Sequence, residues 1–277
     1  MAGSLTVACV QVNAGPEIEP NLHAVGDLIL RAREAGAEFI TTPENVSMVV
    51  QGRARVLERA RPEHDHPAIP FFQDLARQTG AWLLAGSLAV RLEDEDRAAN
   101  RSLLFGPDGA IVARYDKIHM FDVDLANGES YRESATFRPG DKAVLAQTPW
   151  GGVGMTVCYD LRFAYLYRTL AQAGASILTV PSAFTVPTGR AHWHVLLRAR
   201  AIETGCFVIA PAQCGTHDAG RTTYGHSLIV SPWGEILADG GEEPGVVTAR
   251  LDLGEIEKAR GMVPSLKHDR SIAPPVL

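Results

Sequence analysis

Short apolar runs of β type alternate with longer helical segments along almost all of the 277 residues. Residues 5–12 have the composition of a strand, whereas Leu22, Val25 and Ile29 recur at helical spacing within residues 21–35. Turn signals at residues 107–109 and 232–235 join strands as hairpins, so some neighbouring strands run antiparallel. The pattern therefore predicts an α/β fold with mixed sheets and helices on their outer faces.

The same pattern gives the approximate bounds of the elements. We expect helices at residues 21–35, 69–79, 164–173 and 191–203, and strands at residues 5–12, 38–42, 82–90, 102–105, 110–115, 153–157, 176–180, 207–210, 227–230, 235–238 and 246–251. Residues 45–67 are expected to form a loop near the mouth of the active site, whose candidate residues are described below. With 46% hydrophobic residues and no Ser/Gly linker, we predict one domain over residues 1–277.

Net charge and cysteine content limit the kinds of binding partner and the cellular compartment that we expect for this chain. The net charge is −6, and no Lys/Arg run offers a nucleic-acid footprint. No apolar run reaches the roughly twenty residues of a membrane span, and no signal peptide precedes the first strand. The four cysteines have no disulfide-type spacing, so we predict a cytoplasmic protein in which Cys9 and Cys206 are buried and inert. Of the other two cysteines, Cys158 is the candidate for a reactive thiol, for the reasons given next, and Cys214 is a weaker one.

Cys158 stands where an apolar strand, residues 153–157, meets a helical pattern that starts at Phe163. A thiol at such a junction lies on a sharp turn, with the following backbone N–H groups directed at the atom it attacks. The helix N-terminus is expected to favour the thiolate. A lone cysteine after a strand is more often a small buried apolar residue, so this signal needs support from other positions.

Glu44 and Lys117 supply that support, because each also follows a predicted strand. A thiolate attacks a carbonyl or nitrile carbon, and a nearby carboxylate takes the thiol proton and returns it to the leaving amine. A fixed ammonium stabilises the oxyanion. The three residue types together predict a nucleophilic site whose chemistry requires no metal and no cofactor.

Residues 43–44, 116–119 and 157–163 resemble the three signature regions of the nitrilase superfamily of carbon–nitrogen hydrolases. The resemblance extends from residues 5–11 to residues 246–251. It implies Cys158 as nucleophile, Glu44 as general base and Lys117 as oxyanion stabiliser. It also implies a second glutamate that orients the lysine and the substrate, for which Glu133 matches and Glu129 competes.

The resemblance further implies a four-layer α-β-β-α sandwich of two mixed sheets. It implies a homodimer formed through the helices after Cys158 and after Thr188, and higher homo-oligomers stay open. Tyr159 stands where nitrilases proper typically have tryptophan, which favours amide over nitrile substrates.

Residues 181–184, 191–193, 197–204 and 224–227 are similar to the branch with deaminated-glutathione amidases and omega-amidases, and residues 212–217 lean toward the former. We therefore predict a thiol amidohydrolase of small carboxylate-bearing amides, foremost deaminated glutathione. An omega-amidase acting on 2-oxoglutaramate or 2-oxosuccinamate is the alternative, ahead of a nitrilase or an N-carbamoyl amidase. A non-catalytic scaffold of the same fold is disfavoured by the intact Glu44, Lys117 and Cys158.

Arg162 lies four residues after the nucleophile and is a candidate to bind a substrate carboxylate in bidentate fashion. A structural salt bridge with a nearby acid such as Asp160 is the competing interpretation. Phe121, Tyr159 and Phe184 are expected to form walls of the substrate pocket.

Two histidine pairs are weak metal signals. His64 and His66 lie in a charged, proline-flanked segment that we expect to be a solvated loop. His192 and His194 are two residues apart on a predicted helix, so they do not face the same ligand. We therefore predict no metal site from either pair, and we interpret the acidic run at residues 93–96 as a solvated loop.

Overall fold

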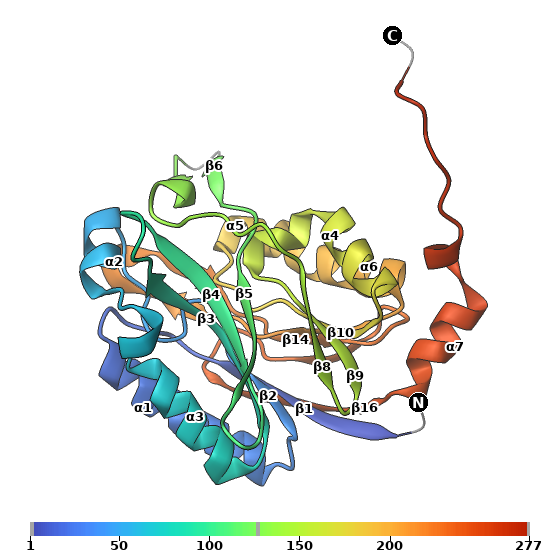
Figure 1. Cartoon of the computed structure of the whole chain (residues 1–277), viewed down its shortest axis with the longest axis horizontal. Helices are drawn as coiled ribbons and strands as arrows, with labels where there is room; N and C mark the ends of the chain where they lie inside the picture. Colours follow the sequence, from blue (N-terminus) through green and yellow to red (C-terminus); the bar gives the residue numbers. More distant parts are fainter. Residues whose placement is uncertain (1–2, 126–127, 276–277) are drawn as a thin grey trace.

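The computed structural model, which describes residues 3–125 and 128–275, contains two six-stranded sheets packed face to face with helices on both outer faces (Figure 1). This arrangement confirms the predicted four-layer α-β-β-α sandwich. Within the described ranges, no helix is both long and apolar enough to cross a membrane. The segment after the last α-helix extends away from the sandwich (Figure 1).

The first sheet combines three parallel strands with antiparallel strands at its edges. Helices α1 (Ile18–Glu34) and α3 (Ala68–Thr79) cover its outer face. Its strands are, in spatial order, β16 (Gly245–Asp252), β1 (Ser4–Gln11), β2 (Phe39–Thr41), β3 (Trp82–Arg91), β4 (Ala98–Phe105) and β5 (Ile111–Asp116).

The second sheet has the same plan, with a parallel centre and antiparallel flanks. Helices α4 (Ala164–Gln172) and α6 (His194–Thr204) cover it, and α5 (Val186–Thr188) and a π-helical turn (Gly189–Trp193) lead into α6. Its strands are, in spatial order, β15 (Ile236–Asp239), β14 (Leu228–Val230), β11 (Phe207–Ala210), β10 (Ala175–Thr179), β9 (Gly151–Met155) and β8 (Val144–Thr148).

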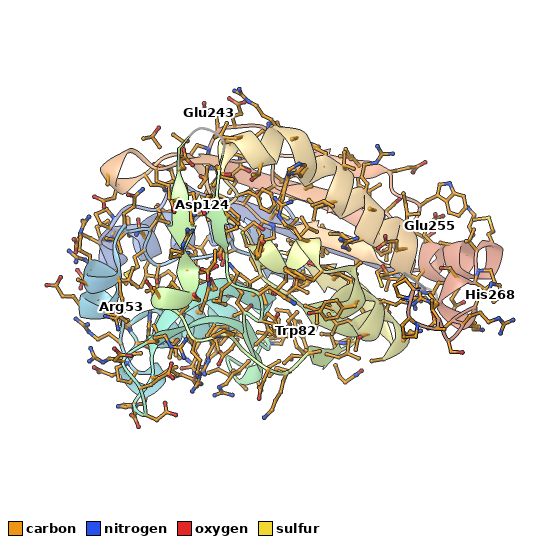
Figure 2. All side chains as sticks on the ribbon, turned by 90° about the horizontal axis from the view of Figure 1, so that it is seen from above. Arg53, Trp82, Asp124, Glu243, Glu255 and His268 are labelled. Carbon is orange, nitrogen blue, oxygen red and sulfur yellow. The ribbon has the colours of Figure 1, made fainter. Side chains whose placement is uncertain are left out.

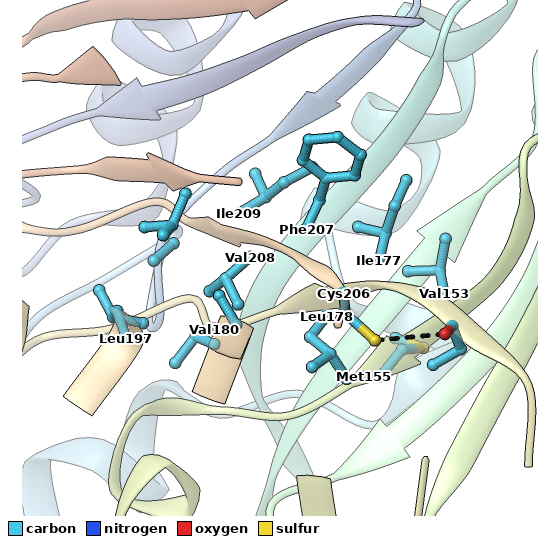
Figure 3. Packing of buried hydrophobic residues seen from close by; sticks show 14 of the residues in the cluster. Val153, Met155, Ile177, Leu178, Val180, Leu197, Cys206, Phe207, Val208 and Ile209 are labelled. Carbon is cyan, nitrogen blue, oxygen red and sulfur yellow. Dashed lines mark hydrogen bonds between the residues drawn. The ribbon is translucent and has the colours of Figure 1, made fainter. Parts of the chain in front are cut away.

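Strand alternation decides which side chains fill which layer. In β1, Leu5, Val7 and Cys9 point between the sheets, whereas Ala8 and Val10 face the helices. Figure 3 shows buried side chains on both faces of β9, β10 and β11, including Leu197 of α6, and the thiol of Cys206, which lies 3.2 Å from the carbonyl oxygen of Ala175. Cys9 and Cys206 are fully buried, as predicted, and burial raises the pKa of Cys9 to about 12.

Several sequence-based expectations were wrong in detail. Residues 45–67 are not a plain loop, because they include α2 (Arg53–Arg59) and a 3-10 turn (Glu63–Asp65). With only Val56 buried, α2 is too short and too polar to show helical periodicity. His66 is not solvated: it is buried, accepts the N–H of Ala68, and burial lowers its pKa to about 4.

Other elements escaped the pattern because they are short or lie at edges. These are β8, α7 (Gly254–Met262) and two small hairpins, β6 (Asp122–Asp124) with β7 (Ser130–Arg132) and β12 (Cys214–Thr216) with β13 (Thr222–Tyr224). Strand β4 begins at Ala98, four residues before the expected start.

Gly86 in β3 marks the place where the ends of the two sheets touch. A Cβ atom there would lie 1.9 Å from the carbonyl oxygen of Thr42, 2.5 Å from that of Pro43 and 2.6 Å from the Cβ of Pro181. The turn after β2 and the turn after β10 therefore approach each other only because residue 86 has no side chain.

We expect Gly86→Ala to lower the free energy of unfolding by about 1–3 kcal/mol, since two backbone carbonyls must move. In a chain of this length each kcal/mol corresponds to roughly 2–4 °C in thermal denaturation. The matched control is Gly261→Ala in α7, where a Cβ meets nothing within 4 Å. Equal melting temperatures for the two variants would contradict the proposed contact.

Candidate active site

Four ionisable side chains from four separate segments converge at one end of the sandwich. Glu44 lies three residues after β2, Lys117 directly after β5, Glu133 directly after β7, and Cys158 three residues after β9. Lys117 Nζ is 2.8 Å from Glu44 Oε1 and 2.9 Å from each carboxylate oxygen of Glu133. The turns after strands of both sheets thus contribute to one site, because strands deliver their following residues to the sheet edge.

The Lys117 ammonium is buried, with its side chain only 2% exposed. Burial alone would lower the pKa of Lys117, but the carboxylates of Glu133 and Glu44 raise it well above the ordinary value. Burial would likewise raise the pKa of Glu44, but Lys117 and further hydrogen bonds hold it below its usual value. Lys117 and Glu44 therefore form a buried ion pair at neutral pH.

Glu133, rather than Glu129, is the glutamate that contacts Lys117. Its Oε2 also accepts the backbone N–H of Phe121 at 2.7 Å. Glu129 lies on the cavity wall and accepts the hydroxyl of Tyr131 at 2.9 Å.

Asn100 in β4 is a member of the cluster that the sequence pattern missed. Its amide nitrogen donates to Glu44 at 2.9 Å and to Glu133 at 3.2 Å, and its backbone carbonyl accepts the N–H of Lys117. The available signal was an asparagine inside a strand that is otherwise almost fully buried. A buried polar side chain needs partners, and here its partners are the two glutamates.

Cys158 occupies a strained turn. Its φ of 49° lies in the left-handed region, which costs a non-glycine residue about 1–3 kcal/mol. Its backbone N–H donates to the carbonyl of Pro181, and the carboxylate of Glu44 is close enough to influence the pKa of its thiol. The turn is a 3-10 helix, Cys158–Arg162, and α4 begins only at Ala164.

The expected lowering of the thiol pKa by a helix N-terminus was therefore wrong. Burial, and next the Glu44 carboxylate, raise the pKa of Cys158 above its usual value, and Lys117 only partly offsets them. The resting site holds a thiol, a carboxylate and an ammonium.

The Asp160 carboxylate stabilises the turn that carries Cys158 by accepting several hydrogen bonds. Its carboxylate accepts the N–H of Val157 at 2.9 Å, the hydroxyl of Tyr115 at 2.6 Å and the N–H of His119 at 3.0 Å, with His119 Nδ1 2.7 Å away. Asp160 has no ion pair with Arg162 in the described part of the chain, so the salt-bridge interpretation of Arg162 was wrong. The Arg162 guanidinium instead lies over the rings of Tyr159 and Phe184, 5.8 and 5.5 Å from their centroids.

A cavity of about 610 Å³ opens onto Cys158. Phe121, Tyr159 and Phe184 line it, whereas Arg162 is not among its lining residues. Figure 2 shows Arg53, which also lines the cavity, on the side of the molecule opposite His268. Cys214 does not line this cavity; it is buried, and burial raises its pKa to about 11, which argues against a second reactive thiol there.

One group of side chains in the described ranges has the donor set of a metal site. His194, His226 and Asp239 place their ligand atoms within 4.8 Å of one another, and His192 is not among them. Asp239 already contacts both rings, at 3.1 Å from His194 Nε2 and 2.9 Å from His226 Nδ1. This cluster lies outside the cavity at Cys158.

The role of Asn100 can be tested by adding charge to the cluster. In Asn100→Asp a third carboxylate faces Glu44 and Glu133, so its folded-state pKa should lie above the unfolded value of about 3.9. The variant should therefore lose stability as pH rises from about 4 through that folded-state pKa, by about 1.4 kcal/mol per unit of pKa shift.

Thermal denaturation between pH 4 and pH 8 measures this loss, with Asn100→Ala as the control that removes the amide without adding charge. Parallel pH profiles for the two variants would show that the carboxylates do not interact with position 100.

Comparisons with known proteins agree with this geometry. The family model described as carbon–nitrogen hydrolase matches residues 6–261. The deaminated glutathione amidase of Yersinia enterocolitica is 39% identical over 269 residues, which cover 96% of this chain and 93% of that protein. The human deaminated glutathione amidase is 40% identical over 268 residues, covering 95% of this chain and 82% of that protein.

The solved structure of the C. elegans NitFhit protein superposes with a TM-score of 0.91 at 34% identity, covering 98% of this chain and 66% of that one. The match to sequence models, relatives and structures extends over nearly the whole chain and includes the segments that carry Glu44, Lys117 and Cys158. The chain therefore belongs to the carbon–nitrogen hydrolase family and is a hydrolase of carbon–nitrogen bonds other than peptide bonds.

Proposed function

We propose that the chain hydrolyses small carboxylate-bearing amides through a thioester at Cys158. The observation that carries this proposal is that Cys158, Glu44 and Lys117 line one cavity, with the Glu44 carboxylate paired to the Lys117 ammonium at 2.8 Å. A nucleophile, a proton acceptor and a cation are thus in mutual reach. A non-catalytic scaffold has no need for a buried ammonium or a strained cysteine.

The first half of the reaction forms the thioester. As Sγ of Cys158 bonds to the amide carbon, its proton passes to Glu44 and the carbonyl oxygen becomes an oxyanion beside Lys117. Glu44 then gives the proton to the leaving nitrogen, the carbon–nitrogen bond breaks and the amine departs. The raised pKa of the thiol fits a proton transfer that accompanies attack.

The second half regenerates the enzyme. Glu44 takes a proton from a water molecule, the hydroxide attacks the thioester carbon, and the oxyanion again faces Lys117. Collapse of the intermediate breaks the carbon–sulfur bond, releases the carboxylic acid and returns the proton to Cys158. Glu133 and Asn100 act as positioning residues that hold Lys117 and Glu44 in place.

Two observations support deaminated glutathione as the substrate. Relatives at 39–41% identity over nearly the whole chain bear the name deaminated glutathione amidase. Arg162 does not itself line the cavity, but its guanidinium lies over two cavity-wall rings and has no carboxylate partner among residues 3–125 and 128–275, and we propose that it binds the carboxylate on the acyl side. The omega-amidase substrates 2-oxoglutaramate and 2-oxosuccinamate share that carboxylate and are the second candidates.

We expect Cys158→Ala to abolish release of the amine from deaminated glutathione while leaving thermal stability close to that of the wild type. Glu44→Gln and Lys117→Met should each lower kcat by about a hundred- to ten-thousand-fold, because proton transfer and oxyanion stabilisation are lost.

A covalent adduct seen in another amidase suggests how the Cys158 intermediate can be detected. In the amidase from Nesterenkonia sp. AN1, 26% identical over 94% of this chain with a TM-score of 0.79, acrylamide adds to the active-site cysteine of a glutamate-to-glutamine variant. Mass spectrometry of this protein with a slow amide should show an acyl adduct on the peptide that contains Cys158. Near-wild-type turnover by Cys158→Ala would refute the mechanism.

We further propose that the protein works as a homodimer in a reducing compartment such as the cytoplasm. Its four cysteines are unpaired, and α4 and α6 expose apolar side chains. Tyr165 is 63% exposed, Val195 67% and Ile202 55%. A second copy that covers these helices would bury this surface and continue the layers from one subunit to the next.

Ile202→Glu should shift the protein from dimer to monomer, because burying a carboxylate without a partner is costly. Light scattering coupled to gel filtration measures the mass. Ile272→Glu in the C-terminal segment is the matched control, since Ile272 is 92% exposed and lies outside these helices. The interface lies elsewhere if both variants have the mass of the wild type.

A further inference from the structure

Three arginines line the cavity at Cys158, and two of them already have carboxylate partners. Arg53 pairs with Asp96 at 2.6 Å, and Nη2 of Arg132 donates to both carboxylate oxygens of Asp124 at 2.9 Å. Arg221 has no such pair within the described ranges. Its Nη2 donates to the carbonyl of Ala183 at 3.0 Å and its Nε has no hydrogen-bond partner.

The loop that carries Arg221 is firmly anchored. The buried ring of His217 contacts the carbonyl of Ala14 and the hydroxyl of Thr223, at 2.9 and 2.7 Å. Asp218 pairs with Arg55 of α2 at 2.6 Å, which ties the loop to the cavity wall. Arg221 is therefore held on a fixed turn rather than on a mobile chain end.

The carboxylates near Arg221 bond to other groups, so its guanidinium is available to a ligand. The guanidinium carbon is 5.8 Å from the centroid of the Tyr131 ring, and the Tyr131 hydroxyl donates to Glu129. Glu44 and Glu133 are engaged by Lys117 and Asn100. A cation in a cavity without an ion-pair partner is the arrangement that binds a carboxylate from a ligand.

The position of Arg221 relates it to the leaving group. Arg221 donates to the carbonyl of Ala183, and the N–H of Ala183 donates to Glu44 at 2.9 Å. Glu44 is the group that delivers the proton to the departing nitrogen, so the amine passes on the side where Glu44 and Arg221 lie. Arg162, by contrast, stacks on Tyr159 and Phe184.

We propose that Arg221 forms a second anion subsite that binds a carboxylate on the amine portion of the substrate. This inference rests on the proposed amidase function and deepens it. The enzyme is then specific for amides with a carboxylate on each side of the scissile bond, in which the leaving amine is an amino acid or a short peptide. Simple amides that release ammonia lack the second anchor.

Binding to the Cys158→Ala protein tests the subsite without turnover. The probes are deaminated glutathione and its analogue in which the glycine carboxylate is a carboxamide, and titration calorimetry gives the two dissociation constants. Cys158→Ala should bind the acid about 10- to 100-fold more tightly, and the added change Arg221→Gln should remove most of that preference. Arg221→Lys should retain part of it, because the charge stays while the bidentate fork is lost.

Arg132→Gln in the same background is the matched control, since Arg132 lines the cavity but is paired with Asp124, and it should keep the preference. Arg162→Gln should weaken both probes equally, because both carry the acyl-side carboxylate. A merely structural Arg221 would also weaken both probes equally, and this result, or no preference in Cys158→Ala, overturns the subsite. Failure of the wild type to cleave deaminated glutathione would instead count against the proposed function.

Discussion

The buried ammonium of Lys117 is the constraint on which the site depends. A cation that is 2% exposed is stable only with charged and hydrogen-bonding partners at close range, and Glu44 and Glu133 supply them. These partners come from the turns after β2 and β7, while Asn100 of β4 bonds to both carboxylates. The cluster therefore couples the register of the first sheet to the placement of the proposed catalytic groups.

The same cluster explains the resting state of the nucleophile. One ammonium between two carboxylates carries a net negative charge, which together with burial disfavours a thiolate at Cys158. In the proposed mechanism, attack on an amide changes this balance, because the negative charge forms on the substrate oxygen while the thiol proton moves to Glu44. In that mechanism the thiol stays protonated until a carbonyl carbon is in place.

The second sheet brings Cys158 to this cluster through backbone contacts. The N–H of Cys158 bonds to the carbonyl of Pro181, and Gly86 lets the turn after β10 approach the turn after β2. Asp160 accepts three further donors and holds the strained turn. Because the two sheets pack face to face, the site forms only when both sheets are folded and docked.

Much of the fold and of the candidate site could be predicted from local sequence. The strand that precedes Glu44, Lys117 or Cys158 is visible in the apolar pattern, and the type of each residue points to its chemistry. Alternation in strands such as β1 also follows from the sequence, since every second side chain must face an apolar layer. The four-layer arrangement was implied only by the resemblance of the signature regions to the carbon–nitrogen hydrolases.

Tertiary structure alone decided the remaining features, because they depend on which distant groups become neighbours. Glu133 rather than Glu129 reaches Lys117 owing to the β6–β7 hairpin, and Asn100 joins through strand pairing. The pKa of Cys158 rises because burial and Glu44 outweigh Lys117, which no local pattern encodes. Arg221 lies more than sixty residues from Cys158 in sequence, and only the folded loop brings it to the cavity.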